Sequence, residues 1–222
     1  QPPAAGNTTN SFYIDPINGS PANDGSEASP WQSLNEVFSS GFIESQRWNK
    51  LGYKPESSYL IPKNSGAPIK GNDTIFLKNG HYGNLNIKGY YNQNPITIAA
   101  YPGHKPVFNS IKVFASSNWV FDGIYVTRND ATFEEPLFFA EKHSWHGPVF
   151  DISLINSHLT GADDISNWYA SEWDTAPYGL RSHADSFVAK NNIIKNIGFA
   201  VESSGKNALF DSNTIDTFSF DA

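Results

Sequence analysis

Short apolar runs separated by Gly, Asn and Pro make up most of this chain, and they lack the spacing of amphipathic helices. The runs are rich in β-branched and aromatic residues and lie at 74–77, 85–87, 96–99, 111–114, 119–121 and 124–126. Because no helix-forming segments alternate with these short strands, the pattern predicts an all-β fold and argues against a doubly wound α/β fold.

A repeat near the end of the chain predicts how the strands are arranged. Residues 178–192 can be laid over residues 199–213 with a constant offset of 21, so that Arg181 falls on Glu202. Four similar segments, at 121–124, 154–157, 189–192 and 210–213, follow one another at spacings of 33, 35 and 21. A repeat of this length in short strands indicates successive turns of a parallel β-coil, in which equivalent residues stack.

Stacked turns predict columns of like residues. Asn192 and Asn213 are expected to form an Asn ladder, with side-chain amides hydrogen-bonded between turns. Tyr178, Phe199 and Phe220 are expected to form a buried aromatic stack.

The chain divides into a tail, an N-terminal cap, an irregular surface excursion and the turns of the coil. We place their bounds at 1–11, 12–40, 41–71 and 72–222. The two longer spacings predict loops at 128–146 and 161–177, and such loops are the first place to seek a binding cleft.

The cap carries the signal of a short helix that covers the open end of the coil. A hydroxyl N-cap and a proline precede apolar residues at helical spacing. These residues are Ser29, Pro30, Trp31, Leu34, Val37 and Phe38.

Composition and charge narrow the class of partner. The 222 residues are 39% hydrophobic, enough for one domain, and no window is apolar enough to span a bilayer. Cys and Met are absent and the start is small and polar, so we expect a processed, secreted chain. The net charge of −7 argues against nucleic acid as a partner, whereas a locally positive strip is expected to bind a polyanion. The strip consists of Arg181, Lys190, Lys195 and Lys206.

Two segments resemble known proteins. Residues 13–20, Tyr-Ile-Asp-Pro-Ile-Asn-Gly-Ser, and 23–34, ending in Ser-Pro-Trp-Gln-Ser-Leu, resemble the N-terminal cap of secreted right-handed parallel β-helix polysaccharide lyases. Residues 201–207, Val-Glu-Ser-Ser-Gly-Lys-Asn, and 211–215 resemble the active-site turn of the lyase family that includes chondroitinase B and many alginate lyases. The resemblance implies a right-handed parallel β-helix with a short capping helix, and a catalytic lysine at Lys206.

The sequence departs from that family at two points. A single acid, Glu202, precedes Lys206 where the family has a pair of calcium-binding acids, and the family's catalytic Arg would lie one turn further on, beyond Ala222. We therefore expect a β-helix that is incomplete at its C-terminus and is completed by a second chain or a C-terminal fragment.

Cleavage of a uronate polymer by β-elimination needs a base for the C5 proton, a group that neutralises the carboxylate, and an acid for the leaving oxygen. Lys206 is the first choice as base, although the repeat also places Asp185 beside it, which would make a simple ion pair. Arg181 and His183 are candidates to neutralise the carboxylate, with Tyr178 or Tyr169 as proton carrier.

Further side chains are candidates for binding. His146 aligns with Arg181 one turn earlier, and Lys190 belongs to the positive strip. Trp168, Tyr169 and Trp173 offer flat rings for sugar faces, or else form a lid that packs on the coil.

Calcium is a candidate cofactor because Glu202 matches the family's metal-binding position. Calcium takes six to eight oxygen ligands, so Glu202 would need help from Asp163, Asp164 or Asp174. An ordinary ion pair between Arg181 and Glu202 is the alternative.

Together these features predict a secreted lyase that cleaves an acidic, uronate-containing polysaccharide, with alginate slightly favoured over pectate or glycosaminoglycan. Two alternatives stay open. Asp163-Asp164 resembles the paired acids of β-helix glycoside hydrolases, and a β-helix adhesin would bind the polymer without cleaving it.

Overall fold

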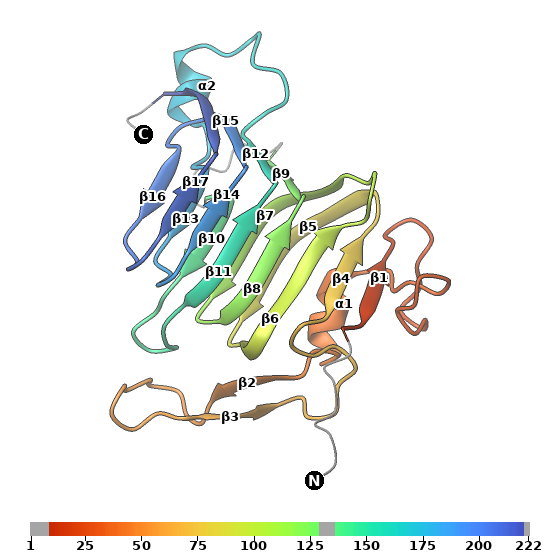
Figure 1. Ribbon diagram of the computed structural model, residues 1–222. Coiled ribbons are helices and arrows are strands. Elements are labelled where there is room, and N and C mark those ends of the chain that lie inside the picture. The colour runs from red at the N-terminus through yellow and green to blue at the C-terminus, as the bar shows by residue number, and fades with distance from the viewer. Residues whose placement is uncertain (1–8, 129–135, 220–222) are drawn as a thin grey trace.

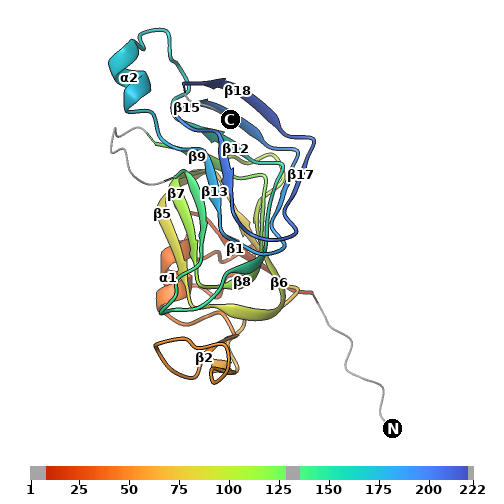
Figure 2. The same ribbon diagram turned by 90° about the vertical axis from the view of Figure 1, so that its left-hand side faces the viewer.

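The computed structural model describes residues 9–128 and 136–219, and these residues form the expected right-handed parallel β-helix. Strands that are distant in sequence lie side by side in successive turns (Figure 1). Figure 2 shows the turns stacked around a common interior. Neither helix in the described residues is long enough to cross a bilayer.

Each turn contributes to a seven-stranded sheet, called sheet A here. Its strands, in spatial order, are β1 (Ser11–Ile14), β4 (Thr74–Leu77), β6 (Tyr91–Ala100), β8 (Ser117–Asp122), β11 (Phe150–Ile155), β14 (Val188–Lys190) and β17 (Leu209–Asp211). All its neighbouring strands are parallel, as expected for a coil that returns to the same side once per turn.

A nine-stranded sheet forms the other two sides and forks at β7 (Pro106–Phe114). The first half of β7 pairs with β9 and its second half pairs with β10, whereas β5 pairs along the whole length of β7. Arm B continues as β9 (Tyr125–Thr127), β12 (His158–Thr160), β15 (Ile193–Ile197) and β18 (Thr214–Phe218). Arm C comprises β5 (Gly80–Lys88), β7, β10 (Phe138–Glu141), β13 (Leu180–Ser182) and β16 (Val201–Ser203).

The predicted register is confirmed. Leu154 pairs with Phe121 on one side and with Ala189 on the other, and Ala189 pairs with Phe210. These partners have the spacings of 33, 35 and 21 found in the sequence. Their side chains point into the coil, where Phe121, Leu154 and Ala189 are fully buried.

The corner between sheet A and arm B explains the Asn-rich segments of the repeat. One residue of each two-residue link has a positive φ: Gly123 (68°), Asn156 (50°), Asn191 (55°) and Ser212 (55°). This left-handed conformation is strained for most residues, and Gly and Asn tolerate it best. Beside it the predicted Asn ladder is confirmed, because Asn192 Nδ2 donates to Asn213 Oδ1 at 2.9 Å.

The capping helix is shorter than the sequence indicated. Helix α1 (Leu34–Ser39) begins after Ser33, not near Ser29. Trp31 instead continues the extended chain, forms a bridge with Ile14, and donates its backbone N–H to the carbonyl of Tyr13 at 3.0 Å. This pairing at the sheet edge outweighs the local helix signal.

Residues 41–71 are not irregular throughout, as had been expected. They contain an antiparallel ribbon of β2 (Ser45–Trp48) and β3 (Leu60–Lys63). The ribbon lies outside the corner between arm C and sheet A (Figure 1). There the ring of Trp48 lies 5.1 Å from that of Tyr91.

Of the two expected loops, that at 128–146 is wrong in its second half, because β10 lies within it. Residues 129–135, like the tail residues 1–8 and Phe220, lie outside the described part of the chain. Residues 161–177 run between β12 and β13, carry α2 (Ala170–Asp174), and project from the coil (Figure 1).

The two ends of the coil differ in burial. Near the N-terminal end Ile14 and Ile75 are fully buried beneath the cap. In the last turn the equivalent apolar positions are open: Phe210 is 41% exposed and Ile215 is 39% exposed, and they line a hollow of about 280 Å³.

Candidate functional site

Charged and aromatic side chains cover the outside of arm C, and we call this surface the outer strip. Its residues are Lys112, Phe114, Phe139, Glu141, Tyr178, Arg181 and Glu202. Phe139, Arg181 and Glu202 occupy one column on β10, β13 and β16, as parallel pairing requires. The strip therefore brings together Arg181 and Tyr178, two of the residues proposed as catalytic.

The cations of the outer strip are paired with carboxylates. Arg181 donates from Nε to Glu202 Oε2 at 2.7 Å, and its Nη2 lies 2.6 Å from the same oxygen. Lys112 Nζ lies 2.8 Å from Glu141 Oε2. The alternative reading of Arg181 and Glu202 as an ordinary ion pair is thus the observed one.

Aromatic rings lie beneath these cations. The Arg181 guanidinium carbon is 5.1 Å from the Tyr178 ring centre and 5.7 Å from that of Phe139. Tyr178 and Phe199 are neighbours, with ring centres 5.8 Å apart, but both are half-exposed on the outside of the coil. The expectation of a buried aromatic stack was wrong because positions 178 and 199 face outward.

His183 lies at the end of β13, against the ring of Phe139 at 5.1 Å. Its backbone N–H donates to the carbonyl of Ala140 at 2.8 Å, and its buried Nδ1 has no partner among the described residues. Burial, followed by the nearby charge of Lys142, lowers the pKa of His183. The imidazole is therefore predominantly neutral at pH 7 and is able to accept a proton.

His146 does not align with Arg181, because Phe139 occupies that place in the register. The sequence alignment of this turn was wrong because it did not recognise β10 as part of the turn. His146 lies in the bend before β11, where its ring is 5.1 Å from that of Phe114 and 5.0 Å from that of His143. Desolvation, then the charges of Lys88 and His143, lower its pKa.

A pocket of about 360 Å³ lies between the ribbon and the coil, and we call it the basic pocket. Its basic residues are Arg47, Lys50, Lys63, Lys88 and His146. Its apolar lining comes from Trp48, Leu51, Tyr91 and Ala115. Lys88 Nζ also lies 5.2 Å from the Phe114 ring, so the pocket is continuous with the outer strip.

Lys63 is the most enclosed cation of the basic pocket. Its ammonium donates to the carbonyls of Gly89 at 2.9 Å and Lys88 at 3.3 Å, and lies 3.2 Å from the Tyr90 ring centre. Burial, together with the charge of Arg47, lowers the pKa of Lys63 to about 8. Near neutral pH this lysine therefore remains mostly charged.

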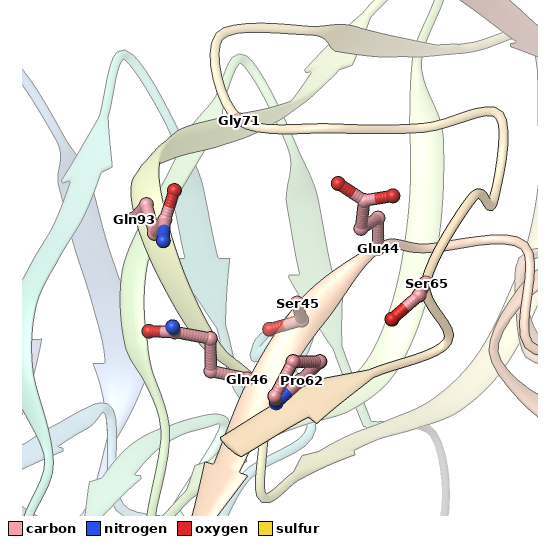
Figure 3. Close-up of a pocket in the computed structure, with 7 residues that line it drawn as sticks. All are labelled: Glu44, Ser45, Gln46, Pro62, Ser65, Gly71 and Gln93. Carbon is pink, nitrogen blue, oxygen red and sulfur yellow. The ribbon is translucent and has the colours of Figure 1, made fainter. Parts of the chain in front are cut away.

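A second, smaller hollow of about 210 Å³ lies near the start of the ribbon. Figure 3 shows Glu44, Gln46 and Gln93 around it, without any Lys or Arg. Glu44 accepts the backbone N–H of Gly66 at 2.6 Å. The amide, hydroxyl and carboxylate groups that line this hollow offer no positive charge to an anion. The hollow therefore differs from the basic pocket.

Lys206 is exposed in the turn after β16. The predicted neighbour Asp185 is present, but its carboxylate accepts the backbone N–H of Lys206 at 2.8 Å. Asp185 therefore fixes the main chain of this turn.

The expected positive strip is not a single surface. Arg181 lies on arm C, Lys195 on arm B, and Lys190 on sheet A, where its ammonium is 3.1 Å from Asp211. A turn of 21 residues crosses three sides, so cations close in sequence face different directions.

The proposed calcium ligands do not come together. Glu202 binds Arg181, whereas Asp163 accepts a hydrogen bond from the Tyr125 hydroxyl on arm B. Asp164 accepts the N–H of Ser166 at 2.9 Å. Within residues 9–128 and 136–219, no three acidic or histidine side chains are grouped as a metal site, so these residues do not fit calcium.

Two of the three aromatic residues in the 161–177 segment pack on one another. Trp168 and Trp173 meet edge to face with ring centres 4.7 Å apart. Tyr169, whose backbone N–H donates to the carboxylate of Glu172 in α2, is 75% exposed. Of the three rings, that of Tyr169 is the most accessible to a ligand.

Comparisons with known proteins support the fold. No family model and no curated protein matches the sequence. The structure is similar to a pectate lyase, Pel9A, with a TM-score of 0.53 and 15% identity over 96% of this chain and 51% of that one. A rhamnogalacturonan lyase is similar with a TM-score of 0.45 and 14% identity over 96% of this chain and 63% of that one. The chain thus spans about half of the first protein and under two thirds of the second. The likeness to Pel9A, at 15% identity, shows the fold alone.

Proposed function

We propose that this protein is a secreted lyase that binds an acidic, uronate-containing polysaccharide and cleaves it by β-elimination. The observation that carries the proposal is a continuous track of cations and aromatic rings, from the basic pocket through Lys88 and Phe114 to Arg181. Cations bind uronate carboxylates, and rings pack on sugar faces. The similarity to pectate lyase Pel9A supports the choice of reaction. Alginate is slightly favoured over pectate and glycosaminoglycan.

The track contains groups for each part of the reaction. His183 and His146 have lowered pKa values, so their neutral imidazoles are suited to take the C5 proton. Arg181 is suited to neutralise the carboxylate, and the Tyr178 hydroxyl beneath it to donate to the leaving oxygen. Lys206 remains the alternative base, from its place in the family motif.

The decisive measurement is ultraviolet absorbance of unsaturated products on a panel of alginate, pectate and glycosaminoglycan. We expect the absorbance to rise on a uronate polymer, and to rise fastest on alginate. New reducing ends without absorbance would show hydrolysis instead. Addition of a chelator tests the metal requirement separately, and a loss of activity would reveal calcium ligands other than Glu202, Asp163 and Asp164.

Substitutions then separate the candidate bases. If His183 is the base, His183→Ala abolishes product formation while Lys206→Ala leaves it within about threefold of the parent; the converse result assigns the base to Lys206. Thermal unfolding of both variants serves as the folding control.

A non-catalytic glycan-binding protein is the second candidate. It is favoured by the pairing of Arg181 with Glu202, because a guanidinium already held by a carboxylate is less available to a substrate. Retained polymer binding with no product on any member of the panel would select this candidate.

We also propose that a further strand-bearing segment, in a second chain or a C-terminal fragment, covers the last turn. The exposed Phe210 and Ile215 support this, as do the outer edges of β16, β17 and β18. Sedimentation of the native protein as a single 222-residue chain, with nothing associated, would contradict it.

A further inference from the structure

The basic pocket differs from every other charged surface described above in the balance of its charges. Four Lys or Arg side chains and one His line it, and no Asp or Glu does. No ion pair joins Arg47, Lys50, Lys63 or Lys88 to a carboxylate in the part of the chain that the structure describes. An anion that enters the pocket therefore does not compete with a built-in carboxylate.

We propose that the basic pocket is a subsite that binds the carboxylate of a single uronic acid unit through its Lys and Arg side chains, apart from the candidate catalytic residues Arg181, Tyr178 and His183. The inference rests on the proposed acidic substrate but not on its cleavage. It assigns a function to the ribbon of β2 and β3, whose residues supply Arg47, Lys50 and Lys63.

The pocket is held in shape before a ligand arrives. Ser45 Oγ lies 2.7 Å from Asn92 Oδ1 and ties β2 to the coil. The backbone N–H groups of Gly52 and Tyr53 both donate to the carbonyl of Trp145, at 3.1 and 3.0 Å. Two segments far apart in sequence are thus joined around the pocket, which reduces the ordering cost of binding.

A small residue lets the ribbon approach the coil this closely. A Cβ atom at Gly147, which has a φ of +122°, would lie 2.4 Å from Nε1 of Trp48. Trp48 in turn packs on Tyr53 at 4.7 Å and on Tyr91 at 5.1 Å. Glycine at 147 is therefore required for the position of Trp48 in the pocket wall.

Size and lining fit a sugar acid. The volume of about 360 Å³ lies at the lower end of small-molecule sites, which span roughly 300–1,000 Å³. Trp48, Leu51 and Tyr91 offer apolar surface for a sugar ring, and the surrounding cations offer charge-assisted hydrogen bonds to its carboxylate. A neutral sugar would offer those cations no carboxylate.

The test is binding of short oligosaccharides to the 222-residue protein, followed by calorimetry and by tryptophan fluorescence. The probes are a trimer of mannuronate, a trimer of galacturonate, and the methyl-esterified galacturonate trimer. We expect the free acids to bind at least about tenfold more tightly than the ester. Equal affinity for acid and ester would overturn the proposal, as would displacement by inorganic sulfate at equal concentration.

A matched pair of double variants locates the binding. Arg47→Gln with Lys50→Gln removes two pocket cations and should weaken binding of the acidic trimers at least about tenfold. Lys54→Gln with Lys70→Gln removes the same charge from exposed residues that do not line the pocket, and should change affinity less than about twofold. Equal losses in both variants would show a general charge effect and contradict the subsite.

The outcomes for binding and cleavage are distinguishable. Pocket-dependent binding of trimers without unsaturated products from polymer would uphold the subsite and defeat the lyase proposal. Product formation with trimer binding that is insensitive to Arg47 and Lys50 would do the reverse. We expect the Arg47→Gln, Lys50→Gln double variant to unfold at the same temperature as the parent. Both side chains are exposed, and of the two only Lys50 makes a side-chain hydrogen bond, to Ser57.

Discussion

The basic pocket and the outer strip are two ends of one track, and they balance their positive charges differently. In the outer strip Arg181 faces Glu202 and Lys112 faces Glu141, each within 2.8 Å. In the basic pocket Lys63 is held by backbone carbonyls and an aromatic ring. The strip therefore has its counterions built in, whereas the pocket leaves its charge for a ligand.

This difference changes where recognition of an acidic polymer is expected. A substrate carboxylate at Arg181 must compete with Glu202, so its net gain there is small. At the pocket the same carboxylate meets cations without a competitor. The strip, where aromatic rings lie near Arg181 and the neutral His183 packs on Phe139, then suits the chemistry, and the pocket suits the binding of the substrate's negative charge.

The largest expected effect comes from giving the pocket a carboxylate of its own. Lys88→Glu would pair with the remaining cations and make the pocket resemble the strip. We expect the affinity for trimannuronate, measured by calorimetry, to fall at least about thirtyfold. Lys88→Gln is the matched control and should lose less, because it removes one charge without adding its opposite. An unaltered affinity in Lys88→Glu would show that the absence of a carboxylate from the basic pocket does not matter for binding. The proposed difference between the basic pocket and the outer strip would then be wrong.

The reverse change in the strip should have a smaller effect of opposite sign. Glu202→Gln keeps the side-chain size but frees Arg181 from its charged partner. Binding of alginate polymer is expected to tighten about threefold, with a loss of stability of no more than about 1 kcal/mol. Weaker polymer binding in this variant would indicate that Glu202 contacts the substrate itself.

A pH titration tests the role of Lys63. With a pKa of about 8, Lys63 loses its proton as pH rises from 7 to 9, so trimer affinity should fall by about threefold over this range. Of the groups around it, His146 has a lowered pKa and Tyr90 has a raised pKa, so neither accounts for a loss of positive charge over this range. Lys63→Gln should remove the dependence.

The same shift makes a prediction for stability. The folded-state pKa of Lys63 lies below the ordinary value of an unfolded chain, so the folded protein binds fewer protons between about pH 8 and 10. Its contribution to stability therefore rises with pH in that window. A parent protein whose denaturation midpoint rises no more than that of Lys63→Gln would contradict this sign.

The smallest effect is expected on sheet A, away from the track. Lys190 pairs with Asp211 on that face, so Lys190→Ala should change polymer affinity less than about twofold. A larger loss of affinity would show that the binding surface extends onto sheet A. It would also support the substrate-binding role that the sequence predicted for Lys190.

The sequence predicts the repetitive part of the fold well. Leu154, Ala189 and Phe210 carry the inward pattern, and Asn192 and Asn213 carry the corner, so register follows from counting residues. Counting fails where a turn has an insertion. His146 was aligned with Arg181 because β10, which follows a long insertion, resembles none of its neighbours in sequence.

The basic pocket is harder to predict from the sequence than the repeat. Residues 45–48, Ser-Gln-Arg-Trp, hold a single apolar side chain and give no strand signal, and Pro62 weakens the signal of the second strand of the ribbon. The basic pocket draws Arg47, Lys63 and His146 from segments with no common spacing, and only tertiary packing brings them together. The alignment of equivalent residues in successive turns predicts contacts within the coil. The basic pocket, however, lies between the coil and the ribbon of β2 and β3, which is not part of the repeat.

The left-handed corner at Gly123, Asn156, Asn191 and Ser212 sets how such a protein is able to change during evolution. One extra residue at this corner would turn the next inward side chain outward, so the core resists small insertions there. At the other two corners the links differ in length, from residues 89–90 between β5 and β6 to residues 161–179 between β12 and β13. The 161–177 segment and the ribbon are both additions outside those corners. A new ligand pocket of this kind is therefore able to arise when a segment is added outside the coil. The turns of the coil itself need not change.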